Sequence, residues 1–292
     1  MVDTYDAPLV VADGEGRRYI NRERLGENYF AVRLDNYPLA VPASGTVMSA
    51  FSIPEDAGHA GDFEAVGLVA NSTVPFTLQL SEVGVQANAF TSGPIHHNLI
   101  AGTGRYPFVF AESIFLLAGR QVQATVTDLS TTLAGSVRLA LIGRKFNNDM
   151  DLAVREKRAQ YLANRPTRAF WLSLDNNSID IAAGSVNNEA FMTMPSGSHF
   201  SADDVMASSS GIFEVAIFDG QAGRQLTYGA QNNGFIDSRM ITGPGGLPAR
   251  LFGSPIIQPR RTIRILLNDL ANNGTNRVFF TFHGRRLRLP VG

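Results

Sequence analysis

One stretch of this chain occurs twice, 141 residues apart. Residues 137–146 read VRLALIGRKF and residues 278–287 read VFFTFHGRRL, so a glycine and two basic residues follow an apolar run in both. Further identical residues match at this spacing and in the same order: Pro54 with Pro195, Pro107 with Pro248, Arg120 with Arg261, and Asp128-Leu129 with Asp269-Leu270. Turn residues shared by unrelated β-domains would not keep this order, so the sequence predicts an internal duplication.

The match continues upstream with a small drift in spacing. FAVRLDN at 30–36 aligns with FWLSLDN at 170–176, and GTVMSAFSIP at 45–54 aligns with GSVNNEAFMTMP at 184–195. Each copy has roughly 120 residues, which is enough to bury a core of its own. The predicted division is an N-terminal arm at 1–25, a first β-sandwich at 26–146, a helical linker at 147–168, and a second β-sandwich with a short C-terminal tail at 169–292.

Both copies consist of alternating or apolar runs separated by Gly, Pro, Asn and Ser, which is typical of strands and turns. The last two runs are QVQATVTDL and SVRLALIGR in the first copy, and TIRILLNDL and RVFFTFHGR in the second. The short polar connections predict that each such pair forms a hairpin. The sequence therefore predicts a mainly β fold of two tandem antiparallel β-sandwich or jelly-roll domains.

One segment carries the signals of a helix. NNDMDLAVREKRAQYLANRP at 147–166 begins with capping Asn and Asp residues, places acidic residues before basic ones, and ends at a proline. Acidic residues near the start and basic residues near the end of a helix stabilise its dipole. This segment predicts a short helix that links the two copies.

Six matched residues are candidates for structural or assembly roles: Asp128 and Asp269, Gly143 and Gly284, and Arg144 and Arg285. The aspartates follow a strand, where a carboxylate can accept hydrogen bonds from turn amides. The glycines interrupt a strand, which predicts a bulge or a close backbone contact. The arginines are candidates for salt bridges between subunits, and a solvated rim is the alternative interpretation.

The polar residues predict no catalytic, cofactor-binding or metal-binding site. Cysteine is absent, which removes thiolate metal sites and cysteine nucleophiles. His96 and His97 are adjacent, and neighbours in an extended segment point to opposite faces, so metal binding is disfavoured there. Asp203 and Asp204 are acids that could bind Ca²⁺, but solvated loop acids are the favoured interpretation because no further acids lie close by. Trp171 aligns with Ala31, so it is not a repeated sugar-binding platform.

Charge and hydropathy limit the partners. The chain has 25 basic and 26 acidic residues and a net charge of -1, which disfavours nucleic acid as the main ligand. Basic residues that flank the copies, such as Arg17-Arg18 and Arg260-Arg261, leave contact with packaged nucleic acid as a hypothesis. No apolar run is long enough for a membrane span. The start has no basic region before its apolar run, so we expect synthesis in the host cytoplasm without a signal peptide.

A cysteine-free tandem of β-sandwiches with an N-terminal arm, a linker helix and Asn-, Gly- and Ser-rich loops resembles bacteriophage virion proteins, among them double jelly-roll coat proteins. The resemblance is architectural, covers residues 26–289 and includes no family motif. It implies a non-enzymatic virion component (coat, collar, tail or decoration protein) that binds copies of itself and other virion proteins. A tandem carbohydrate- or receptor-binding module is the alternative, and an enzyme is a third hypothesis.

Overall fold

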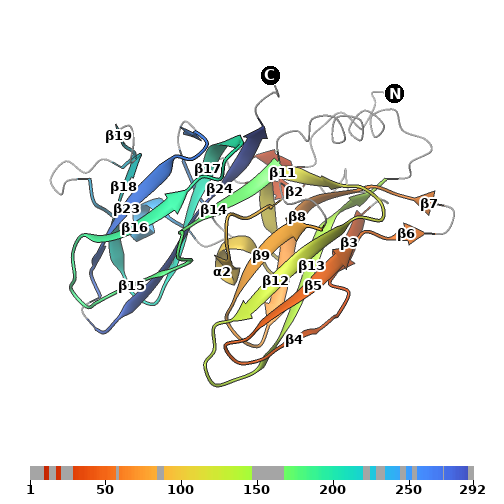
Figure 1. The fold of residues 1–292 in the computed structure, drawn as a ribbon, viewed down its shortest axis with the longest axis horizontal. Coiled ribbons are helices and arrows are strands. Elements are labelled where there is room, and N and C mark those ends of the chain that lie inside the picture. The colour runs from red at the N-terminus through yellow and green to blue at the C-terminus, as the bar shows by residue number, and fades with distance from the viewer. Residues whose placement is uncertain are drawn as a thin grey trace. The chain divides into compact units, whose positions relative to one another are not determined.

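The structure is a computed structural model, drawn in Figure 1. It describes residues 10–12, 18–20, 29–56, 59–83, 89–146, 168–219, 224–227, 234–243, 248–251, 255–271 and 273–288. The linker helix predicted at 147–168 lies outside the described residues except for its last residue. The arm predicted at 1–25 is described only at β1 (Val10–Ala12) and β2 (Arg18–Ile20), which form an antiparallel pair.

The chain divides into two compact units. The first unit contains Met1–Phe90, Ile100–Ala169 and Pro290–Gly292, and the second contains Thr91–Leu99 and Phe170–Leu289. The units follow the two sequence copies except at Thr91–Leu99, which comes from the first copy and belongs to the second unit.

The described part of the first unit consists mainly of antiparallel strands. One sheet has the order β11-β8-β13-β3, with β4 also paired to β13, and the other contains β9-β12-β5 in this order. Their bounds are β3 Tyr29–Arg33, β4 Leu39–Val41, β5 Thr46–Ser52, β8 Phe63–Ser72, β9 Phe76–Glu82, β11 Phe108–Leu116, β12 Gln121–Asp128 and β13 Gly135–Lys145. The shorter elements of this unit are β6 Glu55–Asp56 and β7 His59–Ala60. β10 Ile95–His96 and most of the helix α2 His97–Ile100 come from the first copy and belong to the second unit.

The second unit has two antiparallel sheets in its described part. One has the order β14-β24-β17-β21, with β15 paired to β24 and β22 to β17, and the other has the order β16-β23-β18-β19, with β20 paired to β18. The bounds are β14 Arg168–Ser173, β15 Ile179–Ile181, β16 Asn188–Thr193, β17 Ser198–Ser209, β18 Phe213–Asp219, β19 Arg224–Gln225, β20 Ile236–Asp237, α4 Ser238–Ile241, β21 Ala249–Arg250, β22 Ile256–Ile257, β23 Thr262–Asp269 and β24 Asn276–Arg288.

The two units repeat one strand order. The sheet β3-β13-β8-β11 has its counterpart in β14-β24-β17-β21, and β5-β12-β9 has its counterpart in β16-β23-β18. Single hydrogen bonds repeat as well: Ile53 N donates to Arg120 O at 3.0 Å, and Met194 N donates to Arg261 O at 2.9 Å. The predicted fold class, a mainly β tandem of antiparallel sandwiches made by duplication, is confirmed.

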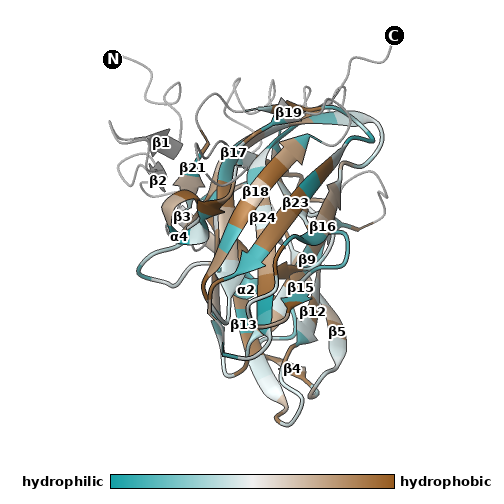
Figure 2. Cartoon of the chain, turned by 90° about the vertical axis from the view of Figure 1, so that its left-hand side faces the viewer, coloured by the Kyte–Doolittle hydropathy of each residue, from teal (hydrophilic) through white to brown (hydrophobic). Residues whose placement is uncertain are grey.

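Side chains on one face of each strand form the core of a unit. In β23 buried residues alternate with more exposed ones, and hydrophobic and hydrophilic bands alternate along β18 and β23 in Figure 2. Alternation of this kind places every second side chain on the inner face of a sheet. The core of the second unit contains large side chains from both of its sheets, including Phe170, Phe200, Phe213, Ile265 and Phe280.

The predicted hairpins are wrong. β12 pairs with β5 and β9, whereas β13 pairs with β3, β4 and β8, so the two strands lie in different sheets; β23 and β24 are separated in the same way. Each connection has six residues, 129–134 and 270–275, which is long enough to cross the roughly 10 Å between packed sheets. Turn residues mark where a strand ends, and they do not specify the sheet in which the next strand pairs.

Two turns of left-handed backbone also repeat, with glycine in one copy only. Gly119 has φ 72° and its counterpart Arg260 has φ 59°. The bonds from Asp128 N to Gly45 O and from Asp269 N to Ser185 O shift the alignment here by one residue, so the structural counterpart of Ser44 (φ 54°) is Gly184 (φ 65°). A side chain at such a φ costs about 1–2 kcal/mol of stability. Glycine avoids this cost, but part of the gain is lost because glycine has more conformational entropy in the unfolded chain.

We therefore expect Arg260→Gly to raise the free energy of unfolding by about 0.5–1 kcal/mol, measured by urea denaturation. The matched opposite change, Gly119→Arg, should lower it by about 1–2 kcal/mol, because it places a side chain at a positive φ. A loss of stability in Arg260→Gly would show that its side chain makes a contact worth more than the backbone strain.

Candidate functional site

Gly143 and Gly284 lie at equivalent irregularities of the two units. The register between β13 and β8 shifts next to Gly143, and the register between β24 and β17 shifts between Ala202 and Asp204, opposite Gly284. A Cβ atom on Gly143 would lie 1.9 Å from the Glu64 carbonyl oxygen, and one on Gly284 would lie 1.9 Å from the Ser201 carbonyl oxygen. Only glycine fits at either position, because the opposing atoms are backbone.

The arginine after each glycine binds a carboxylate of its own unit. Arg144 Nη2 lies 3.1 Å from Glu64 Oε2, and both side chains are at least nine-tenths buried. Ser113 Oγ donates a further hydrogen bond of 2.6 Å to Glu64 Oε1. Arg285 pairs with Asp203 through two contacts, Nε–Oδ2 at 3.2 Å and Nη2–Oδ1 at 3.3 Å, and it is partly exposed. Both arginines therefore hold their own sheets, and an additional role between subunits stays a prediction.

The matched aspartates accept hydrogen bonds from backbone amides. Asp128 Oδ1 accepts from Ser130 N at 2.6 Å, and Asp269 Oδ2 accepts from Gly184 N at 2.9 Å. Asp269 is also bonded by Asn276 Nδ2 at 3.3 Å. The two carboxylates thus bind different loops although they occupy equivalent places.

A second matched pair was missed at the level of the sequence. Asp35 accepts from Ser52 Oγ at 2.7 Å, and Asp175 accepts from Thr193 N and Thr193 Oγ1 at 2.7 and 2.8 Å. Each bond fixes the chain after the first strand of a unit to the edge strand of the opposite sheet. The shared letters LDN at 34–36 and 174–176 were the available signal.

Asp203 and Asp204 are not the solvated loop acids that the sequence favoured. Both are buried in β17, and Asp204 Oδ2 lies 2.8 Å from Nδ1 of His283, which is fully buried. The ring of Trp171 lies 4.7 Å from the His283 ring. The two acids can be buried because each lies close to a basic side chain. Spacing along the sequence does not reveal these partners. A fully buried Trp171 offers no stacking surface to a sugar in solution.

Thr91–Leu99 lies against the outer face of the sheet that contains β14 and β24. Ser92 N donates to Trp171 O at 2.9 Å, and Ser173 N donates to Ser92 Oγ at 2.9 Å. Farther along the segment, the His96 ring lies 4.5 Å from the Phe279 ring. The segment therefore pairs with the edge strand β14 through backbone bonds at one end and packs on the outer side of β24 through a ring contact at the other.

The expectation that His96 and His97 point to opposite faces is wrong. Their rings lie 4.5 Å apart, because the chain turns from β10 into α2 between them. Asn98 N donates to His96 Nδ1 at 3.4 Å, so this nitrogen carries no proton. Burial and the neighbouring His97 lower the pKa of His96 to about 4.

This pKa predicts an acid-sensitive stability. His96 keeps an ordinary pKa near 6.5 in the unfolded chain, so protons bind the unfolded state first as the pH falls below that value. We expect the free energy of unfolding to fall by about 3 kcal/mol between pH 6.5 and 4 from this residue, with no contribution above pH 7. Urea denaturation at a series of pH values measures it.

The control for the pH series is His96→Asn, which keeps a hydrogen-bond acceptor and cannot be protonated. It should flatten the fall in stability between pH 6.5 and 4, although buried His97, whose pKa is also lowered, will leave part of it. An unchanged profile in His96→Asn would contradict the assignment to this ring.

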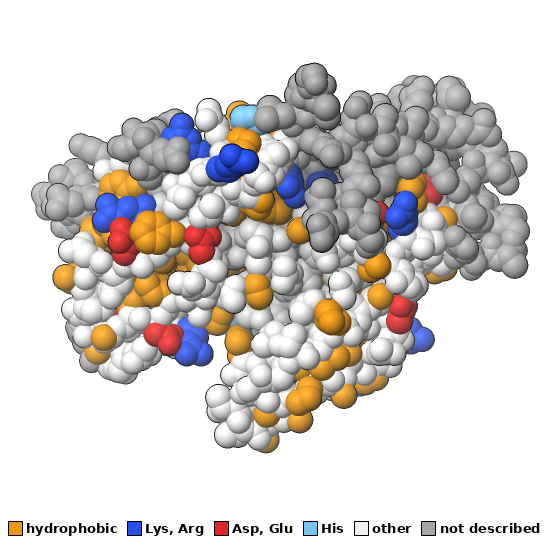
Figure 3. Space-filling view, in the orientation of Figure 1, with side chains coloured by type: hydrophobic (Ala, Val, Ile, Leu, Met, Phe, Trp, Pro, Cys, Tyr) orange, Lys and Arg blue, Asp and Glu red, His pale blue; other side chains and the backbone are white. Residues whose placement is uncertain are grey.

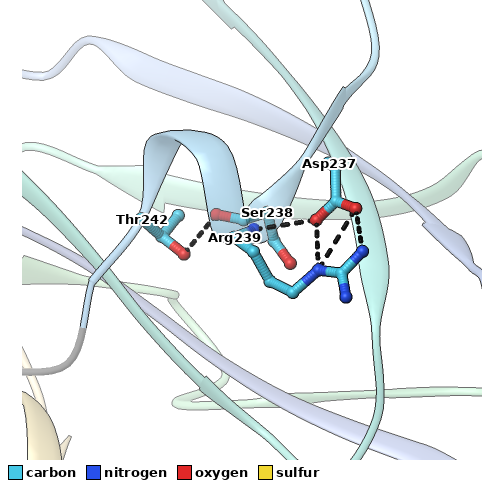
Figure 4. Close-up of polar contacts among 4 residues, drawn as sticks. All are labelled: Asp237, Ser238, Arg239 and Thr242. Carbon is cyan, nitrogen blue, oxygen red and sulfur yellow. Dashed lines mark hydrogen bonds and ion pairs between the residues drawn. The ribbon is translucent and has the colours of Figure 1, made fainter.

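The second copy has its own version of the β10–α2 segment. FIDSRMITG at 235–243 aligns with PIHHNLIAG at 94–102, and it forms β20 and α4. In Figure 4 the carboxylate of Asp237 caps α4, with Oδ1 accepting from Arg239 N at 2.9 Å, and it faces the Arg239 guanidinium. This hydrogen bonding lowers the pKa of Asp237. Thr242 Oγ1 closes the other end of the turn on Ser238 O at 2.7 Å.

The described residues bear on three other kinds of site: a charged strip, a metal site and a membrane span. On the face drawn in Figure 3, basic and acidic side chains are scattered instead of forming one strip. Among the described residues, no group of three or more His, Cys, Asp or Glu side chains is arranged to hold a metal ion. In the same part of the chain, no helix has the length and apolar character that crossing a bilayer requires.

No protein-family model matches this chain, and no curated protein matches its sequence. Among solved structures, it is similar to the STIV MCP, a viral capsid protein, with a TM-score of 0.37 and 9% identity over 89% of this chain and 97% of that chain. Two others have a TM-score of 0.22. They are a structure described by the triple jelly-roll fold and turret assembly in an archaeal virus (9% identity, 87% of this chain, 61% of that chain) and the CUB1-EGF-CUB2 domains of rat MASP-1 (10%, 87%, 97%). Similarity at this level supports no inference about what this chain does.

Proposed function

We propose that this chain is a non-enzymatic structural component of a bacteriophage particle that assembles with copies of itself through its two β-domains and terminal arms. The observation that carries the proposal is the strand order that the two units share. A subunit with two like domains presents two like surfaces. Subunits of this kind form closed assemblies readily, because one type of contact serves at several places.

The chemistry of the described residues is that of a framework. Two buried carboxylates bond to basic side chains of the neighbouring strand, Glu64 to Arg144 and Asp204 to His283. The matched carboxylates hold turns, and the matched glycines hold bulges. These features are expected of two stable units whose surfaces bind other subunits. Contact with packaged nucleic acid through the basic flanks, and the position in the particle, stay predictions.

Light scattering coupled to gel filtration tests the proposal. We expect the purified chain to form a discrete oligomer whose mass is a fixed multiple of the subunit across a wide concentration range, with regular symmetry in projection images. A shell component and a ring component differ in that symmetry. A chain that stays monomeric at every concentration would overturn the proposal.

A further inference from the structure

The equivalent sheet faces of the two units differ in exposure. In the second unit, Ser173 of β14 and Phe279 of β24 are buried, and both lie in contact with Thr91–Leu99. In the first unit, the residues at the matching positions of β3 and β13 are Arg33 and Arg138, and both are exposed. The face that is covered in one copy is therefore open in the other.

The open face has a defined chemistry. The guanidinium carbons of Arg33 and Arg138 lie 5.3 and 6.0 Å from the centre of the Tyr37 ring, and Tyr37 is 42% exposed. Within the part of the chain that the structure describes, neither arginine is in a salt bridge. Two cations on one aromatic ring form a surface that favours a carboxylate and an apolar side chain as its partners.

The segment that would match this face is exposed in the second unit. β20 and α4 are the counterparts of β10 and α2, as the aligned letters at 235–243 and 94–102 indicate. Leu99 is 0% exposed, whereas its counterpart Met240 is 78% exposed. This position of the segment is thus fully buried in one copy, and in the other copy it leaves a large apolar side chain in solvent.

The segment and the open face carry opposite charges at the positions that would meet, and Asp237 would then be shared between Arg138 and Arg239 of its own segment, with which it already pairs. In the covered contact, the His96 ring lies on the Phe279 ring. The counterpart of His96 is Asp237, and the counterpart of Phe279 is Arg138. The same docking geometry would bring the Asp237 carboxylate to the Arg138 guanidinium, so a ring pair in one contact becomes an ion pair in the other.

We propose that the β20–α4 segment of one copy docks on the Arg33–Tyr37–Arg138 face of a second copy, as Thr91–Leu99 docks on the second unit. This inference rests on the self-association in the proposed function and names the surface that performs it. In the contact, Met240 is buried beside Tyr37 and Asp237 pairs with Arg138. The duplicated segment then makes the same kind of contact within a chain and between chains.

Repulsive charges at both elements test the contact. Arg138→Glu and Met240→Lys change exposed side chains, so each variant should fold with an unchanged thermal midpoint and associate at least tenfold more weakly in sedimentation velocity. The matched controls are Arg120→Glu, an exposed arginine elsewhere on the first unit, and Leu133→Lys, an apolar residue that is 65% exposed. The controls should associate like the natural chain.

Disulfide crosslinking gives a direct second test, because the chain has no cysteine. Arg138→Cys chains are mixed with Asp237→Cys chains that carry a different tag, and the mixture is oxidised. We expect a crosslinked dimer that contains both tags, and none when Arg120→Cys replaces Arg138→Cys. An oligomer that resists both Arg138→Glu and Met240→Lys and gives no mixed crosslink would overturn the docking site while leaving self-assembly intact. A natural chain that is monomeric would overturn self-assembly and the docking site together.

Discussion

Alanine at Gly143 or Gly284 is expected to lower the free energy of unfolding of its unit by about 3 kcal/mol. The added methyl group would lie 1.9 Å from a carbonyl oxygen of the neighbouring strand, Glu64 O or Ser201 O. No side chain can rotate away to relieve this contact, because the obstructing atoms are backbone in both cases. The strands must separate locally, which breaks ladder hydrogen bonds on both sides of the bulge.

Urea denaturation followed by tryptophan fluorescence measures the loss of stability and indicates the unit in which it occurs. Trp171 is the only tryptophan and reports on the second unit, so Gly284→Ala should shift its fluorescence transition more than Gly143→Ala does. The control is Gly104→Ala, where a Cβ atom meets nothing within 4 Å. It should change stability by less than about 0.5 kcal/mol. Equal stabilities for Gly104→Ala and Gly284→Ala would contradict the structural role of the bulge.

The duplication could be predicted from the sequence because the repeated features are local. Asp128 and Asp269, and likewise Gly143 and Gly284, each meet a requirement of the backbone at one point of the fold. Such requirements tie a residue type to a place, so both copies keep the same letter. Alternating apolar residues predicted the strands for the same reason.

The pairing of strands could not be predicted in this way. β12 and β13 are consecutive and separated by a short polar loop, which also describes a hairpin. Their partners are distant in the sequence, as in the contacts of β12 with β5 and β9. Since both inner faces are apolar, the pattern specifies which side chains are buried and leaves the choice of neighbour to the packing of the whole unit.

The buried polar groups were also beyond the reach of spacing arguments. Asp204 and His283 are 79 residues apart and meet only because β17 and β24 pair in register. Their counterparts in the first copy are Gly67 and Ile142, so the duplication gives no repeated signal for this pair. The two copies differ at positions such as these, where the surroundings of the side chain are not the same in the two units.

Removal of the Glu64 carboxylate is expected to cause the other large loss, about 3–5 kcal/mol in Glu64→Ala. Arg144 keeps its charge at any accessible pH, and its side chain is only 9% exposed. Without Glu64 the guanidinium stays in a poorly solvated place and retains its ring contact with Phe146, 4.3 Å from Cζ to the ring centre. The stability lost in Glu64→Ala therefore reflects the penalty of an uncompensated buried charge more than the stabilisation that the ion pair provides.

Two matched variants separate these contributions in urea denaturation. Glu189→Ala breaks the exposed pair with Arg264, in which the side chains are 42% and 46% exposed, and it should cost less than about 1 kcal/mol. The double change Glu64→Leu with Arg144→Met removes both buried charges and should recover most of the loss. If the double variant were as unstable as Glu64→Ala alone, the pair itself would stabilise the sheet. Recovery would instead mean that the pair persists because loss of either charge leaves the other buried and unpaired.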